Sequence, residues 1–342
     1  MTTETGNMTA ETGKKPRVVS GIQPSGRLHI GNYIGAISQW VEYQEKFENF
    51  LFIADLHALT VPGAVKPKDL RQRSVEVAGL YVACGIDPER SLIFLQSDVP
   101  EHAYLAWILT CCTPIGWLER MTQFKTKSEG KERVGAGLLT YPSLQAADIL
   151  VYHADLVPVG EDQKQHVEIT RDIAERFNHL FGVYFKAPEH YIPKVGARIM
   201  GLDNPEVKMS KSLAETSRTH AIGLLDPPNV VKKAISSAPT DSKPGVDFAE
   251  TSPGVANLLA IYSCFSGAGD DELRATFEGK PYGFLKKELT ELVNERLSSI
   301  QTRYEELVRS GGLEQLLRDN AEKAREIAGR TVKEVRELTG VG

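Results

Sequence analysis

No apolar run in this sequence approaches the ~18 residues that a membrane-spanning helix needs, so we expect no transmembrane segment and no membrane partner. Residues 1–16 also lack the apolar core of a secretory signal. Their composition and lack of apolar periodicity are typical of a disordered tail. We therefore expect a cytoplasmic protein whose folded part begins near residue 17.

Cysteine is scarce, with four residues among 342. They form no C-x-x-C pair, and their spacing matches no zinc site, so the sequence predicts no metal centre built by the protein. Reduced, mostly buried thiols are the expectation. The cysteines are Cys84, Cys111, Cys112 and Cys264. Several scattered histidines are interpreted as surface or satisfied core residues: His102, His153, His179, His190 and His220.

An excess of positive charge is missing too. Lys and Arg number 40 against 45 Asp and Glu, which gives a formal net charge of −5. The composition therefore gives no sign of a nucleic-acid partner, because the chain has no overall positive charge. The hydrophobic content of 41% and the charged content of 25% are ordinary for a globular protein, and 342 residues suggest about two domains.

The sequence does contain short apolar runs that alternate with longer helical patterns. The runs are rich in β-branched or aromatic residues and predict buried strands at 17–20, 50–54, 91–95 and 156–159. Helical patterns at 66–83 and 103–112 lie between them. Apolar strands joined by helices indicate an α/β fold with a Rossmann-like parallel sheet that is covered on both faces. Ligands then bind beyond the carboxyl ends of the strands, where the strand order reverses.

The second part of the chain has a different character. Several prolines interrupt residues 227–253, and after them apolar residues recur at i, i+3 and i+4 over 256–266 and 285–338. Such periodicity predicts amphipathic helices. The predicted fold is a parallel-sheet domain followed by an all-helical C-terminal domain.

The stretch from Ser20 to Ala36, S-G-I-Q-P-S-G-R-L-H-I-G-N-Y-I-G-A, lies directly after the first predicted strand. A strand, a glycine-containing turn and a helix N-terminus form an anion site, because free backbone N–H groups and the helix dipole point outward there. His29 can donate a hydrogen bond to a phosphate oxygen, and Gly31 lets a flat group approach the backbone. Alone, the motif is equally typical of the first strand–helix turn of any α/β domain.

A second motif makes a specific function the better interpretation. K-M-S-K-S at 208–212 places two lysines around a short segment that contains serine. With H-I-G-N at 29–32, it resembles the two signatures of class I aminoacyl-tRNA synthetases, a HIGH-type first motif and a KMSKS loop. Asn32 stands where the strict first signature has histidine.

Asp148 lies in an apolar segment that we expect to be helical after Pro142 and up to Tyr152. A carboxylate in such surroundings needs a partner, because burying it unpaired is costly. It either turns to solvent on a half-exposed helix or accepts a hydrogen bond from a ligand group that only donates, such as an indole N–H.

The run P-V-G-E-D-Q-K-Q-H at 158–166 opens a predicted helix that continues through Phe181. Acidic residues at such a place are also typical of helix capping. With V-E-I-T-R-D-I-A-E-R-F-N after it and G-A-R-I-M before the lysine motif, the run resembles the tryptophanyl-tRNA synthetase family of bacterial type. The similarity extends from Val18 to about Lys211.

This resemblance implies a tryptophan–tRNA ligase that uses ATP and Mg²⁺ to activate L-tryptophan and transfers it to tRNA(Trp). It also implies a homodimer, for which apolar residues between Leu105 and Trp117 would form the two-fold patch. The domains that it implies are a tail at 1–16, a Rossmann-like catalytic domain at 17–205, a KMSKS loop at 206–215, and an anticodon-binding domain at 216–342 whose last helix packs back on the catalytic domain.

The resemblance also implies roles for individual residues. Those implied for catalysis are His29, Asn32, Lys127, Lys208 and Lys211. Those implied for ATP binding are Gln23, Pro24, Ser25, Gly31, Asn32, Gly160, Glu161, Asp162, Ile199, Lys208, Met209, Ser210, Lys211 and Ser212. Those implied for tryptophan binding are Gly21, Gln23, Tyr141, Gln145, Asp148 and Gln163. Two positions near the amino-acid pocket depart from the family pattern: Gln145 replaces a methionine frequent in bacterial members, and Val19 replaces an aromatic residue.

Three alternatives stay open. The first is a tyrosine–tRNA ligase, because Q-x-x-D at 145–148 resembles the tyrosine-specific relative. The second is a small-molecule nucleotidyltransferase, which has an H-x-G-H turn but lacks the lysine motif and the helical domain. The third is a catalytically silent RNA-binding paralogue, against which the intact His29, Lys208 and Lys211 argue.

Overall fold

The computed structural model describes residues 14–61, 65–130, 133–158, 160, 163–191 and 198–342. Its framework is a five-stranded sheet in the order β3-β2-β1-β4-β5. Its strands are β1 (Arg17–Ile22), β2 (Glu48–Ile53), β3 (Ser91–Leu95), β4 (Leu156–Pro158) and β5 (Glu189–Tyr191). All neighbouring strands run parallel, which confirms the predicted α/β class. Because the strand order reverses between β1 and β4, a ligand site is expected beyond the carboxyl end of β1.

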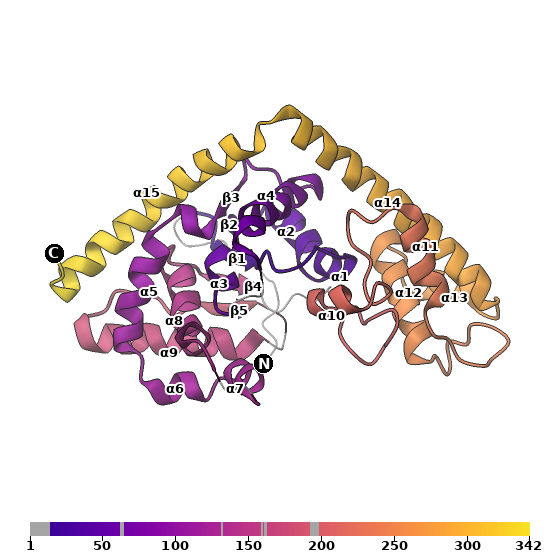
Figure 1. The fold of residues 1–342 in the computed structure, drawn as a ribbon, viewed down its shortest axis with the longest axis horizontal. Helices are drawn as coiled ribbons and strands as arrows, with labels where there is room; N and C mark the ends of the chain where they lie inside the picture. The colour runs from indigo at the N-terminus through magenta and orange to yellow at the C-terminus, as the bar shows by residue number, and fades with distance from the viewer. Residues whose placement is uncertain (1–13, 62–64, 131–132, 159, 161–162, 192–197) are drawn as a thin grey trace.

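Helices cover both faces of this sheet (Figure 1). Phe50 and Phe52 of β2 share a hydrophobic cluster with α5, α8 and α9, whereas Leu51 and Ile53 share another with α2 and α4. Because successive side chains of a strand point to opposite faces, β2 contributes to a hydrophobic core on each side of the sheet. The helices of this part are α1 (Ile30–Asn32), the π-helical turn η1 (Tyr33–Ile37), α2 (Ser38–Tyr43), α3 (Asp55–Ala58), α4 (Pro67–Ala83), the 3₁₀ turn η2 (Gln96–Asp98), α5 (Glu101–Cys112), α6 (Ile115–Glu119), α7 (Thr122–Ser128), α8 (Ala136–Leu150) and α9 (Lys164–Phe181).

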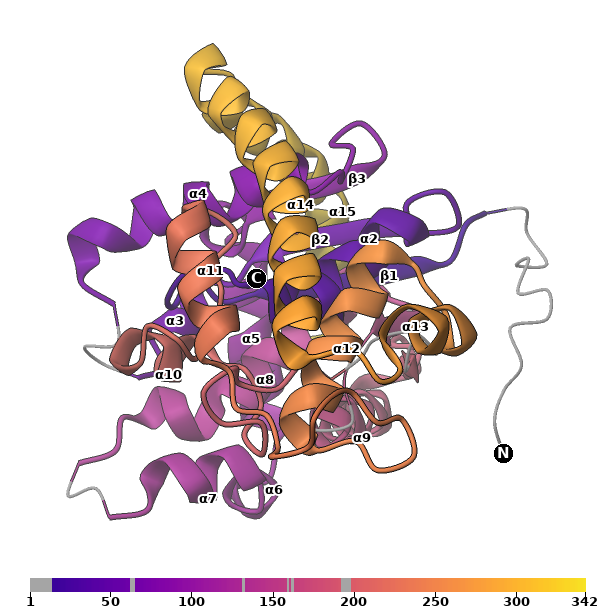
Figure 2. The same cartoon turned by 90° about the vertical axis from the view of Figure 1, so that its right-hand side faces the viewer.

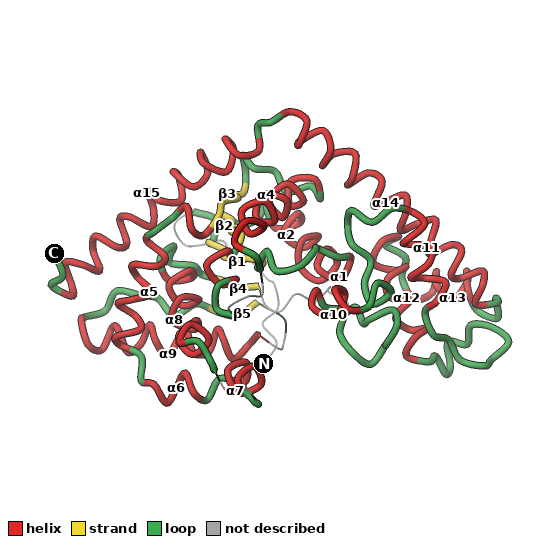
Figure 3. The backbone as a smooth tube through the Cα atoms, in the orientation of Figure 1, coloured by secondary structure: helices red, strands yellow, loops and turns green. Residues whose placement is uncertain are grey.

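The rest of the described chain is helical. Its helices are α10 (Lys211–Thr216), α11 (Pro228–Ser237), α12 (Pro253–Ser266), α13 (Asp270–Phe277), α14 (Tyr282–Ser310) and α15 (Leu313–Thr339). Helix α14 packs against α11 and α12 (Figure 1 and Figure 2). After a short turn, α15 runs back along β3 and α5, as the backbone trace in Figure 3 shows.

Helix α15 covers the edge strand of the sheet. Ala321, Ala324 and Ala328 are buried in the cluster that also contains Phe94 of β3. Their small side chains let the helix approach closely, and the helix protects a strand edge that would otherwise invite pairing with another chain. The last helix thus lies against the parallel-sheet part of the chain. The domain boundaries given above stay predictions.

Two helical segments differ from expectation. Helix α8 begins at Ala136, so Pro142 lies inside it rather than before it. The proline removes one backbone hydrogen bond, and burial of Leu138, Pro142 and Ser143 against the core keeps the helix intact. The helix after the first motif contains a π-turn, in which the Ser38 N–H bonds to the Tyr33 carbonyl. Such turns are frequent at functional sites. None of the described helices is long and apolar enough to cross a membrane.

Candidate active site

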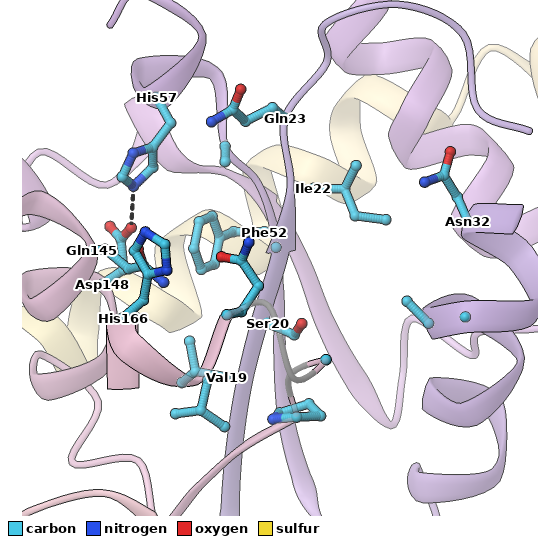
Figure 4. A pocket seen from close by; sticks show the side chains of 18 of the residues that line it. Val19, Ser20, Ile22, Gln23, Asn32, Phe52, His57, Gln145, Asp148 and His166 are labelled. Atoms are coloured by element: carbon cyan, nitrogen blue, oxygen red, sulfur yellow. Dashed lines mark hydrogen bonds and ion pairs between the residues drawn. The ribbon is translucent and has the colours of Figure 1, made fainter. Parts of the chain in front are cut away.

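A cavity of about 710 Å³ opens beyond the carboxyl ends of β1 and β2. Figure 4 shows side chains on both sides of β1: Asn32 lies on one side, and Gln145 and Asp148 lie on the other. We call these the α1 half, lined by His29, Gly31 and Asn32, and the α8 half, lined by Tyr141, Gln145, Asp148 and His166. The cavity therefore lies at the switch in strand order, where the sequence predicted a ligand site.

The α1 half is built around His29, which directly precedes α1 and is only 3% exposed. The Asn32 Oδ1 accepts a hydrogen bond from the His29 backbone N–H at 3.2 Å. Neither ring nitrogen of His29 has a hydrogen-bond partner within the described part of the chain. Burial, followed by the positive charge of Lys211, lowers the pKa of His29 to about 3, so the ring is neutral near pH 7. A neutral, buried and unsatisfied imidazole is prepared for a ligand.

The KMSKS loop reaches this half of the cavity. The Met209 N–H donates to the Ile199 carbonyl at 3.0 Å, and its side chain is 3% exposed. A Cβ added to Gly31 would lie 3.0 Å from the His29 Nδ1 and 3.3 Å from the Met209 sulfur, so a side chain there would crowd both groups. The Lys211 Nζ donates to the Gln23 carbonyl at 2.7 Å. The Lys211 side chain is half-buried, and burial lowers the pKa of Lys211 to about 7.

The α8 half is built around Asp148, which is 1% exposed. Its Oδ2 lies 2.7 Å from the His57 Nε2, a contact drawn in Figure 4. Its Oδ1 lies 2.6 Å from the His102 Nδ1 and accepts from the Gln96 Nε2 at 2.6 Å. Burial alone would raise the pKa of Asp148, but the hydrogen bonds from His102 and His57 hold it below its ordinary value. The alternative of a solvent-facing aspartate is wrong, because three donors enclose an ionised carboxylate.

One further contact sets the tautomer of His102. Its Nε2 lies 2.7 Å from the Tyr152 hydroxyl. Because a carboxylate only accepts, the Nδ1 of His102 carries the proton and the Nε2 accepts the tyrosine O–H. A carboxylate has about four lone-pair sites, and the buried donors occupy three. Since Asp148 also lines the cavity, it can accept one more hydrogen bond, from a ligand.

Other polar side chains surround this acceptor. The Tyr141 hydroxyl lies 2.7 Å from the His166 Nε2, and burial raises the pKa of Tyr141 to about 12, so the phenol stays protonated. Gln145 lies one helical turn before Asp148 on the same face of α8. Gln163, which directly precedes α9, also lines the cavity. The α8 half thus combines hydrogen-bonding groups with the apolar Phe52 and Val19.

The structure brings most of the predicted site residues to one cavity. Its lining includes Gly21, Gln23, His29, Gly31, Asn32, Lys127, Tyr141, Gln145, Asp148, Gly160, Gln163, Ile199, Lys208 and Met209. Pro24, Ser25, Ser210, Lys211 and Ser212 are not part of the lining; they belong to the turn and the loop that border it. Glu161 and Asp162 lie outside the described residues. The binding and catalytic roles of these residues stay predictions.

Sequence reasoning missed the donors that enclose Asp148. His57 and Gln96 come just after β2 and β3, so strand ends alone could have placed them at the ligand edge of the sheet. His102 is a satisfied core residue, as predicted, but its partner lies 46 positions away. No local motif marks a pair at that separation.

No group of three or more His, Cys, Asp or Glu side chains could hold a metal ion within the residues that the structure describes.

Comparisons of the sequence and of the structure with known proteins identify the same family. Residues 11–298 match the family model "tRNA synthetases class I (W and Y)". A curated tryptophan–tRNA ligase of Wolinella succinogenes is 50% identical over 329 residues, which are 96% of this chain and 99% of the relative. The structure of tryptophanyl-tRNA synthetase from Mycoplasma pneumoniae matches with a TM-score of 0.87 and 38% identity, over 96% of this chain and 98% of that one. The Campylobacter jejuni synthetase, complexed with ADP and tryptophan, matches with a TM-score of 0.82 and 39% identity, over 95% and 99%.

The neutral state of His29 predicts a measurable pH dependence of stability. Between its folded pKa of about 3 and an unfolded pKa near 6.5, only the unfolded chain binds the proton, so stability rises with pH. This one residue contributes a slope of up to ~1.4 kcal/mol per pH unit. In His29→Gln, the free energy of unfolding should therefore fall less steeply when pH is lowered from 6.5 to 4.5.

Urea unfolding curves at several pH values in this range measure that slope. His179→Gln is the matched control, because His179 is exposed near the end of α9 and should leave the slope unchanged. Equal slopes for His29→Gln and the parent would show that His29 titrates normally in the folded protein.

Proposed function

This chain belongs to the tryptophan and tyrosine branch of the class I tRNA synthetases, and from that premise we infer its reaction. It is a tryptophan–tRNA ligase of bacterial type, which activates tryptophan with ATP and transfers it to tRNA(Trp). The observation that carries this conclusion is about 50% identity to curated tryptophan–tRNA ligases over nearly the whole length of both chains. That likeness favours tryptophan over the tyrosine alternative.

The reaction has two steps. A carboxylate oxygen of tryptophan attacks the α-phosphorus of ATP, the bond from that phosphorus to the bridging oxygen breaks, and pyrophosphate leaves with the electron pair. A terminal ribose hydroxyl of the tRNA then attacks the adenylate carbonyl, loses its proton, and AMP leaves. Phosphoryl transfer of this kind depends on positioning and on neutralising charge more than on a protein nucleophile.

We assign the α1 half to ATP. The neutral ring of His29 can donate to a phosphate oxygen, and the backbone at Gly31 is open to a flat or anionic group. Ile199 and Met209 provide apolar surface for adenine. Beside them, the turn at 23–25 and Asn32 would hold the phosphates, and Gly160 and Asp162 would hold the ribose.

The lysines would neutralise the charge that develops on pyrophosphate. Lys127 and Lys208 reach the cavity from α7 and from the KMSKS loop, and Lys211 already reaches the turn at Gln23. Fixed positive groups lower a barrier most when they are placed before the charge forms. Mg²⁺ would enter as part of the Mg·ATP substrate.

We assign the α8 half to tryptophan. The fourth lone pair of Asp148 would accept the indole N–H, while Tyr141 and Gln163 would hold the amino group. Gln145 borders the ring beside Asp148. A pocket that bonds a polar ligand group rejects analogues that lack the group by ~10⁴–10⁵, so a separate editing site is unnecessary.

Amino-acid-dependent ATP–pyrophosphate exchange tests this function. Tryptophan should support exchange, and tyrosine should give a kcat/KM at least ~10²-fold lower. Exchange that depends on tyrosine rather than tryptophan would overturn the assignment.

The surroundings of Asp148 determine which variant tests its role. Asp148→Ala would strand three buried donors and destabilise the fold by ~3–5 kcal/mol, so it cannot separate binding from folding. Asp148→Asn keeps the shape, and its oxygen can still serve Gln96 and His102. Its NH₂ group then takes the place of Oδ2, where it can donate to the His57 Nε2 once that ring carries its proton on Nδ1, but cannot accept from a ligand. We expect kcat/KM for tryptophan to fall at least ~10-fold while the KM for ATP stays unchanged.

Melting curves recorded with the same samples establish that the variant is folded. Asp172→Asn, on the exposed face of α9, is the matched control. A folded Asp148→Asn protein with the parent's kcat/KM would make Asp148 a purely structural residue.

We further propose a cytoplasmic homodimer that assembles through α5 and α6. Trp107 and Ile115 are 69% and 63% exposed there, beside the half-exposed Tyr104, whereas Leu105 is buried and belongs to the core. Trp107→Glu should convert a species of twice the chain mass into a monomer, as measured by light scattering. Val183→Glu is the control, because Val183 is 94% exposed elsewhere. A fully active monomeric parent would contradict this assembly.

A further inference from the structure

The chain that follows the KMSKS loop contacts the loop through a buried histidine, His220. This residue is 2% exposed, and its carbonyl accepts the Leu202 N–H at 3.0 Å. Its ring lies over Gly201: a Cβ built there would come within 2.3 Å of the ring carbon Cε1. The absence of a side chain at residue 201 therefore makes room for the imidazole. Neither the family signatures nor the spacing of the two motifs pointed to this histidine.

Both ring nitrogens of His220 are engaged, one by Asp203 just before the KMSKS loop and the other by Ser210 within it. The Nδ1 lies 2.6 Å from the Asp203 Oδ1, and the Ser210 backbone N–H donates to the Nε2 at 3.3 Å. Because a carboxylate only accepts, the Nδ1 carries the proton, which leaves the Nε2 lone pair for Ser210. Asp203 is itself oriented, since its Oδ2 accepts from the Ser217 hydroxyl at 2.5 Å.

The charge state of Asp203 agrees with this arrangement. Burial alone would raise the pKa of Asp203, but the hydrogen bonds from Ser217 and His220 hold it below its ordinary value. The carboxylate is thus ionised near neutral pH and keeps the His220 ring in one tautomer. The other tautomer would place an N–H against the Ser210 N–H and lose the bond.

The Ser210 N–H lies between the two lysines of the KMSKS loop. Ser210 separates the Met209 backbone, which bonds to Ile199, from Lys211, whose ammonium bonds to the Gln23 carbonyl. Ser210 is also the N-cap of α10, where its hydroxyl accepts the Leu213 N–H at 3.4 Å. Fixing this one backbone N–H therefore fixes the course of the chain between Lys208 and the start of α10.

We propose that His220 is a positioning residue for tryptophan activation. Oriented by Asp203, its Nε2 holds the Ser210 N–H and thereby keeps Lys208 and Lys211 directed at the first motif. The catalytic consequence rests on the proposed function, because it needs these lysines to neutralise ATP phosphate charge. The structural part, a loop held through one ring nitrogen, does not depend on it.

Two substitutions separate the two nitrogens. His220→Gln places an amide near the position of Nε2, where its oxygen can accept from Ser210. His220→Asn places its amide near Nδ1, where it can bond to Asp203 but cannot reach Ser210. Both variants lose the ring and one of its hydrogen bonds, so a residue with only a structural role would respond alike to both.

In ATP–pyrophosphate exchange with tryptophan, His220→Asn should lower kcat ~10-fold, the equivalent of one hydrogen bond, with the KM for tryptophan unchanged. His220→Gln should stay within ~3-fold of the parent, because it keeps that bond. In a Lys211→Ala background the difference between the two variants should shrink, because the group being positioned is gone.

Trypsin provides a readout that needs no activity, because it cleaves after Lys208 and Lys211. Cleavage of a folded protein follows the population of locally open states. His220→Asn should be cut at these sites ~10-fold faster than the parent, and His220→Gln at nearly the parent's rate, with melting temperatures recorded for both. Equal cleavage rates for the two variants, or faster cleavage of His220→Gln, would overturn the role of His220. A parent without tryptophan-dependent exchange would instead contradict the proposed function.

Discussion

The constraint on which the site depends is a buried negative charge. An ionised carboxylate at the position of Asp148 is stable only with hydrogen-bond donors on all sides, because the interior does not solvate it. The donors come from three elements: His57 from α3, Gln96 from η2 and His102 from α5. The carboxylate thus ties α8 to the ends of β2 and β3, and the α8 half of the cavity is shaped by that requirement. An acceptor held so firmly can distinguish a ligand that donates from one that does not.

The α1 half depends on a different kind of support. Its first motif pairs with chain that follows the KMSKS loop, since Ile30 donates to the Ile222 carbonyl and Leu224 donates to the Leu28 carbonyl, both at 2.9 Å. Beyond this pairing, one hydrophobic cluster runs from α2 and α4 into α12 and α14. Residues almost two hundred positions apart in sequence are therefore assembled by the same core. This agrees with the sequence analysis, in which the first motif alone was weak and the pair was informative.

Local pattern was enough to predict β1 to β4, the parallel sheet and the helical character of the second half. It missed β5, because that strand has only three residues and two of them are exposed. Apolar runs such as 50–54 and 91–95 have a period and composition that leave few other structures. Pattern failed at α8, because tertiary packing overrides the tendency of Pro142 to end a helix. It also failed for the partners of Asp148. The need for a partner could be argued from burial, but its identity depends on which elements the fold brings together. The hydrogen-bond partners of His102 and His220 could not be predicted either. Asp148 lies 46 positions from His102, and the partner of the His220 Nε2 is the backbone N–H of Ser210 in a loop.

We propose that Asp148 selects tryptophan through the indole N–H. The most direct measurement compares tryptophan with its benzothiophene analogue, in which sulfur replaces the N–H and the bicyclic shape is kept. The account predicts that kcat/KM in ATP–pyrophosphate exchange is at least ~10²-fold lower for the analogue, because a buried acceptor is left without its donor. An analogue used within a few-fold of tryptophan would contradict it.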